Sequence, residues 1–554
     1  MRWREWEEAS FELARERGVP VLAYVRASWC PHCARQDRQF EDGRVVALLS
    51  ERFVCVQVDK DRRPDLDREY APDGWPALAF VDHDGELLDL SNFLDSEALL
   101  ARVAAVQAAW DAGRRATIPR GTRASPARGA IDADCGATLA RAAREQRDPR
   151  HGGFGRGMKF PHADLLLFLL ARGESGDDEA RAMGRAELER LCASPLHDRA
   201  RGGFFRLCER PDWSVPHREK LLETNTELLE ALVAAHAQSP APALLEAASG
   251  IVAFLRRDLL DERLGAFVGS VASDEDGGPK RDEIVHADAN LACVSALLRA
   301  AAVLEDERAA ELAHAAMEFV ATRMVDERGV HHWHDGQAHL PGRLLDAARF
   351  VRAVVDEAAW SGDNARLPQA EAVAKRVEDD LSDHDGAFAD EPATVFARHP
   401  QAPRRRSLRD NAAMAQALCA LARHAGDARH EQRALRVLEA FAGEHKRHGL
   451  AAAEHAMAAQ LALQPSVSVV IVGARDDDRA RAMRRTALAR PLRWRTVATL
   501  DPRHDAVRLA ATSYFRDVEA PRAYLSRGGS SRATCSDPDR LGVLLDHLER
   551  PGEG

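Results

Sequence analysis

The chain of 554 residues lacks the features that mark several common classes of protein. It has no block of Lys and Arg long enough to follow a phosphate backbone, and its net charge is −11, so a nucleic-acid partner is not expected. No apolar run approaches the roughly 20 residues that a membrane span needs. The N-terminal stretch "MRWREWEEASFELARERG" carries no apolar signal-peptide core. We therefore expect a soluble, cytoplasmic protein with no membrane partner.

Closely spaced cysteines are also scarce, because only Cys30 and Cys33, in "SWCPHC", have a short spacing among nine cysteines. This excludes a disulfide-stapled secreted framework and indicates a reducing compartment with mostly buried thiols. A zinc site would need two further ligands, and no second CxxC motif is present. We therefore expect no metal and no cofactor. The isolated Cys55, in the alternating stretch "FVCVQVD", is predicted to be a core residue.

Residues 1–110 alternate between helical and strand patterns, which predicts an α/β domain with a layered structure. The CxxC motif falls where the first strand gives way to a helix. Cys30 is therefore predicted at the helix N-terminus, where unsatisfied N–H groups and the helix dipole favour its thiolate, and Cys33 is the resolving thiol one turn deeper. The expected elements are a helix over 6–17, a strand over 20–26, a helix over 34–50, a strand over 53–59, a further apolar strand and a hairpin turn at Asp84-Gly85.

The motifs "WCPHC" and "GWP" resemble those of the thioredoxin superfamily, over about residues 6–108. The resemblance implies a cis bond before Pro76 and substrate contacts from Trp75 and Pro76. A protonated His32 would further stabilise the Cys30 thiolate. The superfamily's buried acid falls on Tyr24 here, which leaves its proton-shuttling role unfilled. That departure implies slow turnover as a reductase and leaves a role as sensor or oxidant open.

After a polar, Gly-, Pro- and Arg-rich linker at 111–130, a "GGF" motif or its relic recurs six times in residues 131–464. An amphipathic helix precedes each motif and a more apolar helix follows it. Six such pairs predict a closed (α/α)6 toroid with the apolar helices inside, and an open solenoid is the competing architecture. The first glycines of the six motifs are Gly152, Gly202, Gly265, Gly329, Gly386 and Gly449.

The N-termini of the inner helices of a toroid meet at one mouth, which predicts a concave binding site there. Capping alone explains Asp, Asn and Glu at such positions, but His and Lys do not cap helix N-termini. Paired carboxylates at a mouth suit acid–base work on a sugar. The candidate mouth residues are His162, His217, Glu219, Lys220, Asn225, Asp288, Asn290, Asp410 and Asn411.

Four histidines in "VHHWHDGQAH" fall in a predicted mouth loop, but no acidic partner is fixed by their spacing, so a metal is not predicted. Residues 465–554 contain a buried-strand run, "SVSVVIVG", a helix, two further strand-like pieces and a last helix. They predict a small α/β appendage. The fold class is therefore multidomain, with a thioredoxin-like domain, an all-α toroid and this appendage.

The whole chain resembles the thioredoxin-domain-containing family typified by spermatogenesis-associated protein 20 and its bacterial relatives. The motifs that carry the resemblance include "SWCPHC", "GWPALAFVDHDG", "GGFGRGMKFPHADLLLFLL", "EKLLETN" and "AYLSRGGSSRATCSDPDRL". The resemblance implies a thioredoxin-like domain joined to a six-hairpin, glycosidase-like toroid, and no settled reaction. Two C-terminal cysteines of the family fall on Ser526 and Ser531 here, and Thr224 falls where a family motif has Asp.

Three functions remain open after the sequence alone. The first is a thiol–disulfide oxidoreductase acting on a protein or small-molecule disulfide, and the intact CxxC motif favours it. The second is a carbohydrate-active toroid of hydrolase or epimerase type, regulated by the thioredoxin-like domain, with a carbohydrate-like ligand and carriers such as Glu219, Asp288 and Asp410. The third is a non-catalytic binding protein. Fold analogy alone does not establish chemistry.

Overall fold

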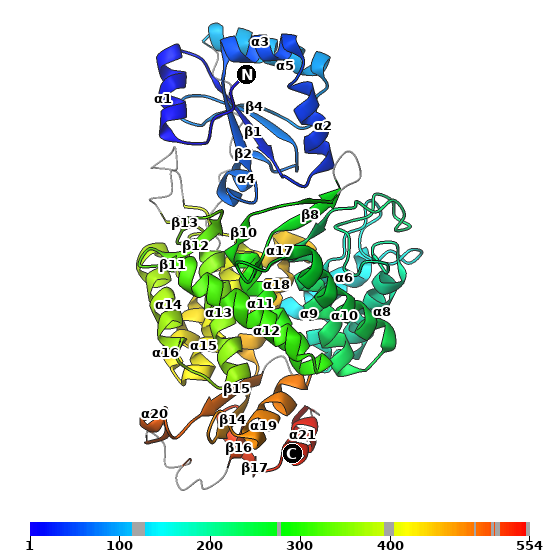
Figure 1. Ribbon diagram of the computed structural model, residues 1–554, viewed down its shortest axis with the longest axis vertical. Coiled ribbons are helices and arrows are strands. Elements are labelled where there is room, and N and C mark those ends of the chain that lie inside the picture. Colours follow the sequence, from blue (N-terminus) through cyan, green and yellow to red (C-terminus); the bar gives the residue numbers. More distant parts are fainter. Residues whose placement is uncertain are drawn as a thin grey trace. The chain divides into compact units, whose positions relative to one another are not determined.

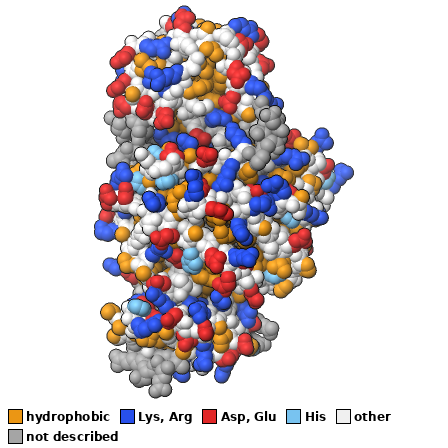
Figure 2. All heavy atoms as spheres, in the orientation of Figure 1, with side chains coloured by type: hydrophobic (Ala, Val, Ile, Leu, Met, Phe, Trp, Pro, Cys, Tyr) orange, Lys and Arg blue, Asp and Glu red, His pale blue; other side chains and the backbone are white. Residues whose placement is uncertain are grey.

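The computed structural model describes residues 1–113, 128–273, 279–392, 404–491, 495–510, 515 and 521–549. Most of the predicted linker therefore lies outside the described residues. The chain divides into two compact units, residues 1–125 with 391–404 and residues 126–390 with 405–554 (Figure 1). Acidic and basic side chains are interspersed over the face shown in Figure 2, as the near balance of their numbers leads one to expect.

The N-terminal unit is a thioredoxin-like α/β domain built on a four-stranded sheet of order β2-β1-β3-β4. Strands β1 and β2 are parallel, whereas β3 and β4 run antiparallel to their neighbours. Buried apolar side chains form one core on each face of the sheet, because both faces are covered by helices. The strands are β1 (Val21–Arg26), β2 (Val54–Asp59), β3 (Ala77–Val81) and β4 (Leu87–Ser91), and the helices are α1 (Glu8–Arg17), α2 (Pro31–Gln39), α3 (Gly43–Arg52), α4 (Pro64–Tyr70) and α5 (Ser96–Asp111).

The structure corrects one predicted element of this unit. The single helix expected over 34–50 is two helices, α2 and α3, because Asp42 begins a new helix. Its carboxylate accepts a hydrogen bond from the backbone N–H of Arg44 at 2.8 Å, as an N-cap residue does. Helices α4 and α5 were not among the predicted elements. The predicted hairpin turn is present, with Gly85 at a φ of 79°.

Among the described residues of the second unit, twelve helices form two concentric rings, which confirms the predicted (α/α)6 toroid. Each inner helix packs against the next, and α18 packs against α7, so the ring is closed and the open solenoid is excluded. The inner helices are α7 (Ala163–Glu174), α9 (Leu222–Gln238), α11 (Ala287–Leu304), α13 (Leu344–Ser361), α15 (Leu408–Ala425) and α18 (Ala453–Leu463). The outer helices are α6 (Cys135–Gln146), α8 (Asp178–Ala193), α10 (Pro242–Phe254), α12 (Glu307–Arg323), α14 (Leu367–Leu381) and α16 (Ala428–Ala440).

The repeated glycine motif has a conformational cause. The first glycine of all six motifs has a positive φ, between 53° and 110°. At Gly202 a side chain would also be blocked, since a Cβ there would lie 2.3 Å from the backbone oxygen of Gly250 in α10. These positions therefore favour glycine, and the repeat marks the turn that leads from each outer helix toward the next inner one.

Helix α11 qualifies the expectation that no segment could cross a membrane. By length and composition alone, Ala287–Leu304 is apolar enough to do so. The helix belongs to the inner ring of the toroid and packs against α9, α12 and α13. Of its residues, 61% are buried inside the structure. Its apolar character is therefore accounted for by the core of the toroid.

Short strands connect the helices on the N-terminal side of the inner ring. They are β5 (Lys220–Leu221), β6 (Leu260–Asp261), β7 (Ala266–Phe267), β8 (Ser270–Ser273), β9 (Pro279–Arg281), β10 (Val285–His286), β11 (Val325–Asp326), β12 (Gly329–His334) and β13 (Ala338–Pro341). The predicted histidine loop is thus strand β12 with its hairpin partner β13.

The C-terminal appendage is a four-stranded sheet of order β15-β14-β16-β17 with its own core. It belongs to the same compact unit as the toroid. Ser526 and Ser531, where the family has cysteines, are direct partners across the β16–β17 ladder. The elements are β14 (Val467–Val472), α19 (Asp478–Ala489), β15 (Arg495–Leu500), α20 (Ala506–Ala510), β16 (Arg522–Arg527), β17 (Ser530–Cys535) and α21 (Pro538–Glu549).

The appendage lies across the end of the toroid where the inner helices finish. Arg299, near the end of α11, donates hydrogen bonds to the backbone oxygens of Leu488 and Arg490, the second at 2.6 Å. Asn364, just beyond α13, donates to the backbone oxygen of Thr499 at 3.1 Å. These bonds to carbonyl groups hold α19 and β15 against this end of the ring.

Candidate functional site

The two cysteines of the CxxC motif lie at one edge of the N-terminal sheet. Cys30 is the N-cap residue of α2 and is 5% exposed, and Cys33 is fully buried in the first turn. Both are free thiols. Strand β1 ends, and the antiparallel β3 begins, where Val25 pairs with Ala77. The segments that follow β1 and precede β3 therefore meet at this edge, and the expected cis bond between Trp75 and Pro76 is present there.

An aromatic surface borders the cysteines. The rings of Trp29 and Trp75 meet edge to face with centroids 5.7 Å apart. The ammonium of Lys60 lies 5.5 Å from the first ring centroid and 4.8 Å from the second, within the range of cation–π attraction. Trp29 also donates from Nε1 to Asp61 at 2.8 Å. This arrangement holds Trp75, predicted to contact substrate, against Trp29, the residue that precedes Cys30.

The two thiols are electrostatically unequal. A hydrogen bond to Cys30 and burial together raise the pKa of Cys33, against smaller lowering effects from the backbone N–H of Ala27 and the charge of Arg26. Cys33 therefore keeps its proton and donates it toward the Cys30 sulfur. Such a bond stabilises negative charge on Cys30, which already lies at a helix N-terminus.

His32 is exposed, and its Nδ1 contacts the guanidinium of Arg35. Because a guanidinium only donates, the imidazole nitrogen is an acceptor in this contact. The positive charge expected from a protonated His32 is thus supplied next to it by Arg35. Whether His32 or Trp75 contacts substrate stays a prediction.

Below Cys33, the place assigned to a buried acid is taken by a group of three side chains. The hydroxyl of Tyr24 donates to Asp37 Oδ1 at 2.9 Å and to the backbone oxygen of Cys33 at 3.1 Å. Arg26 donates to Asp37 Oδ2 at 3.1 Å. Asp37 was missed in the sequence, although its position one helical turn after Cys33 places it on the same face of α2.

In the toroid, the three predicted mouth asparagines bind backbone rather than facing a ligand. Each is fully buried at the start of an inner helix. Each side chain accepts from the N–H and donates to the C=O of a phenylalanine in the preceding "GGF" motif or its relic, and its second N–H donates to the carbonyl four residues earlier. The pairs are Asn225 with Phe204, Asn290 with Phe267 and Asn411 with Phe388, at 2.7–3.0 Å.

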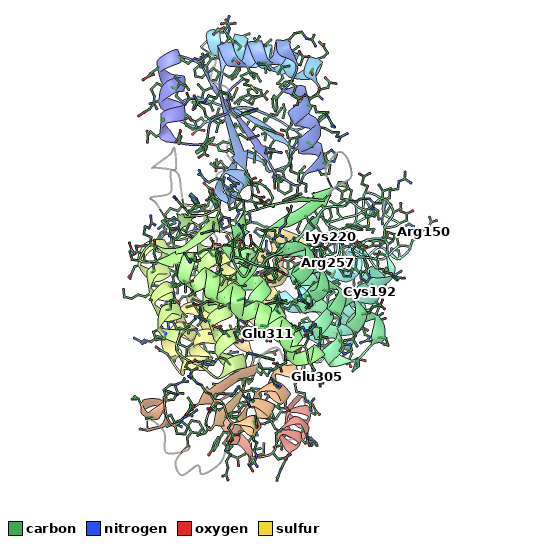
Figure 3. All side chains as sticks on the ribbon, viewed as in Figure 1. Arg150, Cys192, Lys220, Arg257, Glu305 and Glu311 are labelled. Carbon is green, nitrogen blue, oxygen red and sulfur yellow. The ribbon has the colours of Figure 1, made fainter. Side chains whose placement is uncertain are left out.

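Lys220 and His217 are also held by neighbouring side chains. The Lys220 ammonium donates to Asp198 Oδ2 and to the backbone oxygen of Gly202, both at 2.7 Å. Lys220 lies near Arg257 (Figure 3), and burial, with a smaller effect of that charge, lowers its pKa. The His217 ring lies 3.2 Å from Glu219 and 2.9 Å from Glu209. These carboxylates, the Glu219 hydrogen bond first, raise the pKa of His217.

His162 is the candidate with the most unusual backbone. It precedes α7 in the left-handed region, with φ and ψ of 48°, which is rare for a residue with a side chain. Its ring lies edge-on to Phe154 and Phe160. Burial lowers its pKa, so the imidazole is neutral near pH 7. Backbone strain of this kind is often kept at functional sites.

Asp288 belongs to a buried cluster that a metal ion could fit by distance. One ligand atom each of Asp288, His332 and Asp346 lie within 4.8 Å of one another. His332 Nδ1 is 3.0 Å from Asp346, and Arg343 lies 3.4 Å from the same nitrogen. Burial lowers the pKa of His332, but the charges of Asp346 and Asp288 and the hydrogen bond to Asp346 together outweigh it, and the pKa is raised. Two carboxylates are thus balanced by an imidazolium and a guanidinium, which occupy the place of a cation.

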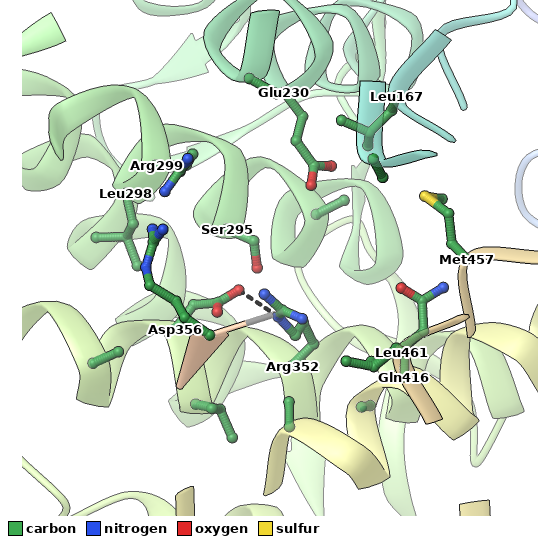
Figure 4. Close-up of a pocket in the computed structure, with 18 of the residues that line it drawn as sticks. Leu167, Glu230, Ser295, Leu298, Arg299, Arg352, Asp356, Gln416, Met457 and Leu461 are labelled. Atoms are coloured by element: carbon green, nitrogen blue, oxygen red, sulfur yellow. Dashed lines mark hydrogen bonds and ion pairs between the residues drawn. The ribbon is translucent and has the colours of Figure 1, made fainter. Parts of the chain in front are cut away.

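A cavity of about 200 Å³ runs along the inside of the ring (Figure 4). It reaches from Asp164, at the start of α7, to Leu488 and Val497 of the appendage. In the wall of the cavity, Arg352 donates a hydrogen bond to Asp356, one turn further along α13, at 2.8 Å. The charged residues that line it are Asp164, Glu174, Glu227, Glu230, Asp356, Glu454, Arg299, Arg349, Arg352, Arg423 and Arg495.

Glu227 is an acid of this cavity with a strongly perturbed pKa. Burial, with the nearby charge of Glu223, raises the pKa of Glu227 to about 8, and Arg409 opposes the shift. Arg409 donates to both carboxylates at 3.0 Å. At neutral pH Glu227 therefore carries a proton and can donate a hydrogen bond, which an ordinary carboxylate cannot.

Sequence reasoning placed the mouth site on helix starts and missed most of the cavity residues. Asp410 is fully buried at the start of α15, and Glu219 pairs with His217 outside the cavity lining. The missed signal was charge inside apolar helices. Glu223 and Glu227 are four residues apart, and Arg349, Arg352 and Asp356 follow at three and four, so each set lies on one face of its helix.

The fold and the CxxC site define a protein with a thioredoxin-like domain and a six-hairpin helical toroid. Residues 1–115 match the family model Thioredox_DsbH, described as "Protein of unknown function, DUF255". Human spermatogenesis-associated protein 20 is 27% identical over 318 residues, which make up 51% of this chain and 40% of the human protein. The predicted resemblance is confirmed: the chain is similar to spermatogenesis-associated protein 20 over about half of its length. It spans about two fifths of the length of these curated relatives.

Two further likenesses concern the separate parts. Protein disulfide isomerase-like 5-3 of Oryza sativa subsp. japonica is 31% identical over 80 residues, 14% of this chain and 19% of that protein. The cellobiose 2-epimerase of Bacillus thermoamylovorans B4167 covers 55% of this chain and 84% of its own, at 12% identity and a TM-score of 0.48. The toroid itself rests on the closed ring of packed helices described above.

Proposed function

We propose that the N-terminal unit is a thiol–disulfide oxidoreductase whose reactive pair is Cys30 and Cys33. The observation that carries this proposal is the hydrogen bond from Cys33 to the Cys30 sulfur at the N-terminus of α2. It gives one thiol the character of a nucleophile and keeps the other protonated until it is needed. The substrate class is a protein or small-molecule disulfide, and the proposed compartment is the cytoplasm.

The reaction proceeds in two exchanges. The Cys30 thiolate attacks one substrate sulfur, so that a Cys30–substrate bond forms, the substrate disulfide breaks and its second sulfur leaves as a thiolate. Cys33 then loses its proton and attacks the Cys30 sulfur. This forms the Cys30–Cys33 disulfide and releases the first substrate sulfur as a thiolate. Two electrons pass from the cysteine pair to the substrate, and the released thiolates take up the protons.

Trapping with Cys33→Ser tests the proposal, because removal of the resolving thiol stalls exchange at the mixed disulfide. We expect discrete adducts through Cys30, identified by mass spectrometry after isolation from cells. Cys30→Ser is the matched control, since it removes the nucleophile and retains every other cysteine. Equal adducts with both variants, or none with Cys33→Ser, would overturn the proposal.

We propose as a second candidate that the cavity of the toroid binds a small polar ligand of carbohydrate-like chemistry. The cavity has a volume of about 200 Å³, which is enough space for a small ligand. Carboxylates and guanidinium groups both line it, so hydroxyl groups would find acceptors and donors there. Protonated Glu227 adds a further donor.

Calorimetric titration of the full chain with glucose, mannose and cellobiose tests the second candidate. We expect saturable heat for at least one sugar and its loss in Arg352→Met, which removes a guanidinium from the cavity wall. Arg308→Met, on the exposed face of α12, is the control. No saturable heat from any of the three sugars would leave the toroid as a scaffold for the redox domain.

A further inference from the structure

The resolving cysteine, Cys33, lies close to a charged side chain, Arg26, that has no role in the exchange reaction described above. Arg26 is the last residue of β1, and the backbone N–H of the next residue, Ala27, donates to the Cys33 sulfur. The Arg26 side chain is close enough for its charge to act on the same sulfur. Its Nε–H is buried and has no hydrogen-bond partner among the described residues. The guanidinium thus keeps one buried N–H that is not used in a hydrogen bond among the described residues.

The guanidinium is held in place by its own partners. Asp37, on α2, accepts from Arg26 at 3.1 Å and from the Tyr24 hydroxyl at 2.9 Å. Burial raises the pKa of Tyr24 far above neutrality, so its hydroxyl acts as a donor and not as a base. Asp59, on β2, is the other acid that acts on Arg26. Arg26 therefore stays charged although it is mostly buried.

Formation of the mixed disulfide changes the balance at Cys33. Before it forms, the hydrogen bond to Cys30 and the negative charge on Cys30 both oppose loss of the Cys33 proton. Once Cys30 is bonded to substrate, its sulfur carries no charge and both effects disappear. Burial then opposes ionisation, and the Ala27 N–H and the Arg26 charge favour it.

We propose that Arg26, held by Asp37 and Tyr24, is the positioning residue for the resolving step, and that it stabilises the Cys33 thiolate which attacks the mixed disulfide. This inference rests on the proposed exchange reaction and names the group that drives its second half. Arg26 acts through Cys33 and touches no substrate atom. The three side chains take the place of a single buried acid beneath the cysteine pair.

The two exchanges can be timed separately with dithiobis(nitrobenzoate), an aromatic disulfide whose released thiolate is coloured. The reduced full-length chain is mixed with less than one equivalent of reagent in a stopped-flow instrument. The first coloured equivalent reports attack by Cys30, and the second reports attack by Cys33. Cys33→Ser identifies the second phase, because it releases only the first equivalent. A missing first phase in the unmodified chain would contradict the exchange reaction itself, not the role of Arg26.

The Arg26 variants change only the second phase if the inference is right. In Arg26→Met we expect its pH midpoint to rise by about one unit or more. For each unit by which the midpoint rises, the fraction of Cys33 present as thiolate at neutral pH falls about tenfold. The thiolate that remains is about threefold more nucleophilic, so the rate of the second phase falls about threefold per unit. Arg26→Lys restores most of the rate, because the charge is kept. Arg102→Met, which breaks an exposed pair with Asp89 in the same unit, is the control.

Asp37→Asn supplies a test of opposite sign. Removal of this carboxylate leaves the Arg26 charge less compensated, with only Asp59 of the two acids remaining, so the midpoint of the second phase should fall. Opposite shifts in Arg26→Met and Asp37→Asn, with an unchanged first phase, would establish the proposed role. An unchanged second-phase midpoint in both variants, when both are folded by circular dichroism, would overturn it.

Discussion

Asn411 encloses the backbone of Phe388. Its side chain accepts from the Phe388 N–H at 2.8 Å and donates to the C=O of the same residue at 2.9 Å. The same bonds recur at Asn225 and Asn290, so one device joins three turns of the toroid to the inner helices that follow them. These asparagines shape the mouth of the toroid.

Replacement of this asparagine should therefore cost stability. Asn411→Ala leaves the N–H and C=O of Phe388 buried without partners, at about 1–3 kcal/mol for each group. We expect a loss of about 2–5 kcal/mol in the free energy of unfolding of the second unit, measured by urea titration. Thr322→Ala, on an exposed face of α12, should change it by less than about 0.5 kcal/mol. Equal effects of the two substitutions would contradict the structural role of Asn411.

Glu227 should make the toroid less stable as the pH rises. Its pKa in the folded chain is about 8, raised by burial and Glu223 from an ordinary value near 4.5. The folded state therefore holds a proton that the unfolded state releases between these values, and stability falls as the pH rises through 8. In Glu227→Gln we expect this part of the decline to disappear, as followed by urea titration from pH 5 to pH 9. A decline of the same size in the variant would assign the effect to other groups.

The buried cluster around His332 should depend on its carboxylates and not on a metal ion. Asp346→Asn leaves the His332 and Arg343 charges in excess inside the toroid, and breaking a buried pair costs about 3–5 kcal/mol. The folded-state pKa of His332 is raised, so its contribution is present below the ordinary value near 6.5 and is lost as the pH rises through the folded value. Unfolding at pH 6 and pH 9 measures both effects.

Chelation gives the complementary result for this cluster. Because Arg343 balances its charge, we expect the melting temperature of the chain to be the same with EDTA, with Zn²⁺ and with Mg²⁺. A rise of several degrees with either ion, lost in Asp346→Asn, would show that a metal displaces the guanidinium.

Arg299 should control how firmly the appendage closes the toroid. Arg299→Met removes the hydrogen bonds to the carbonyls of Leu488 and Arg490. We expect faster amide hydrogen exchange in α19 and β15, with little change in α7 and α18, neither of which adjoins α11 in the ring. Arg308→Met, on the exposed face of α12, is the matched control. Unchanged exchange in α19 would mean that the cores of the two parts hold the appendage without this residue.

Local pattern was sufficient to predict most of the fold. The alternation of apolar residues, the six turn glycines and the CxxC motif are properties of short stretches, and their structural consequences follow from backbone sterics and helix periodicity. The interruption between α2 and α3 was harder to predict from the sequence, because a single side chain, Asp42, sets it within an otherwise helical stretch.

The candidate sites also include features that local sequence motifs predict and features that depend on packing. The placement of Cys30 at a helix start and the cis bond at Pro76 follow from sequence motifs. Asp37 beneath Cys33, and Glu227 inside the ring, depend on which helix faces come together across distances that no local pattern encodes. Asn225 and Lys220 were predicted to face a ligand. Only the packed structure shows that their side chains already form hydrogen bonds to backbone groups.

The sequence by itself determined most of the order of elements, the glycine turns and the CxxC motif at a helix start, because each arises from residues that are neighbours in the chain. Only the tertiary structure decided which charges meet. Burial and neighbouring charge act through space, so the protonated Glu227, the balanced cluster of His332 and Arg343, and the Arg26–Asp37 pair below Cys33 exist only once the chain is folded.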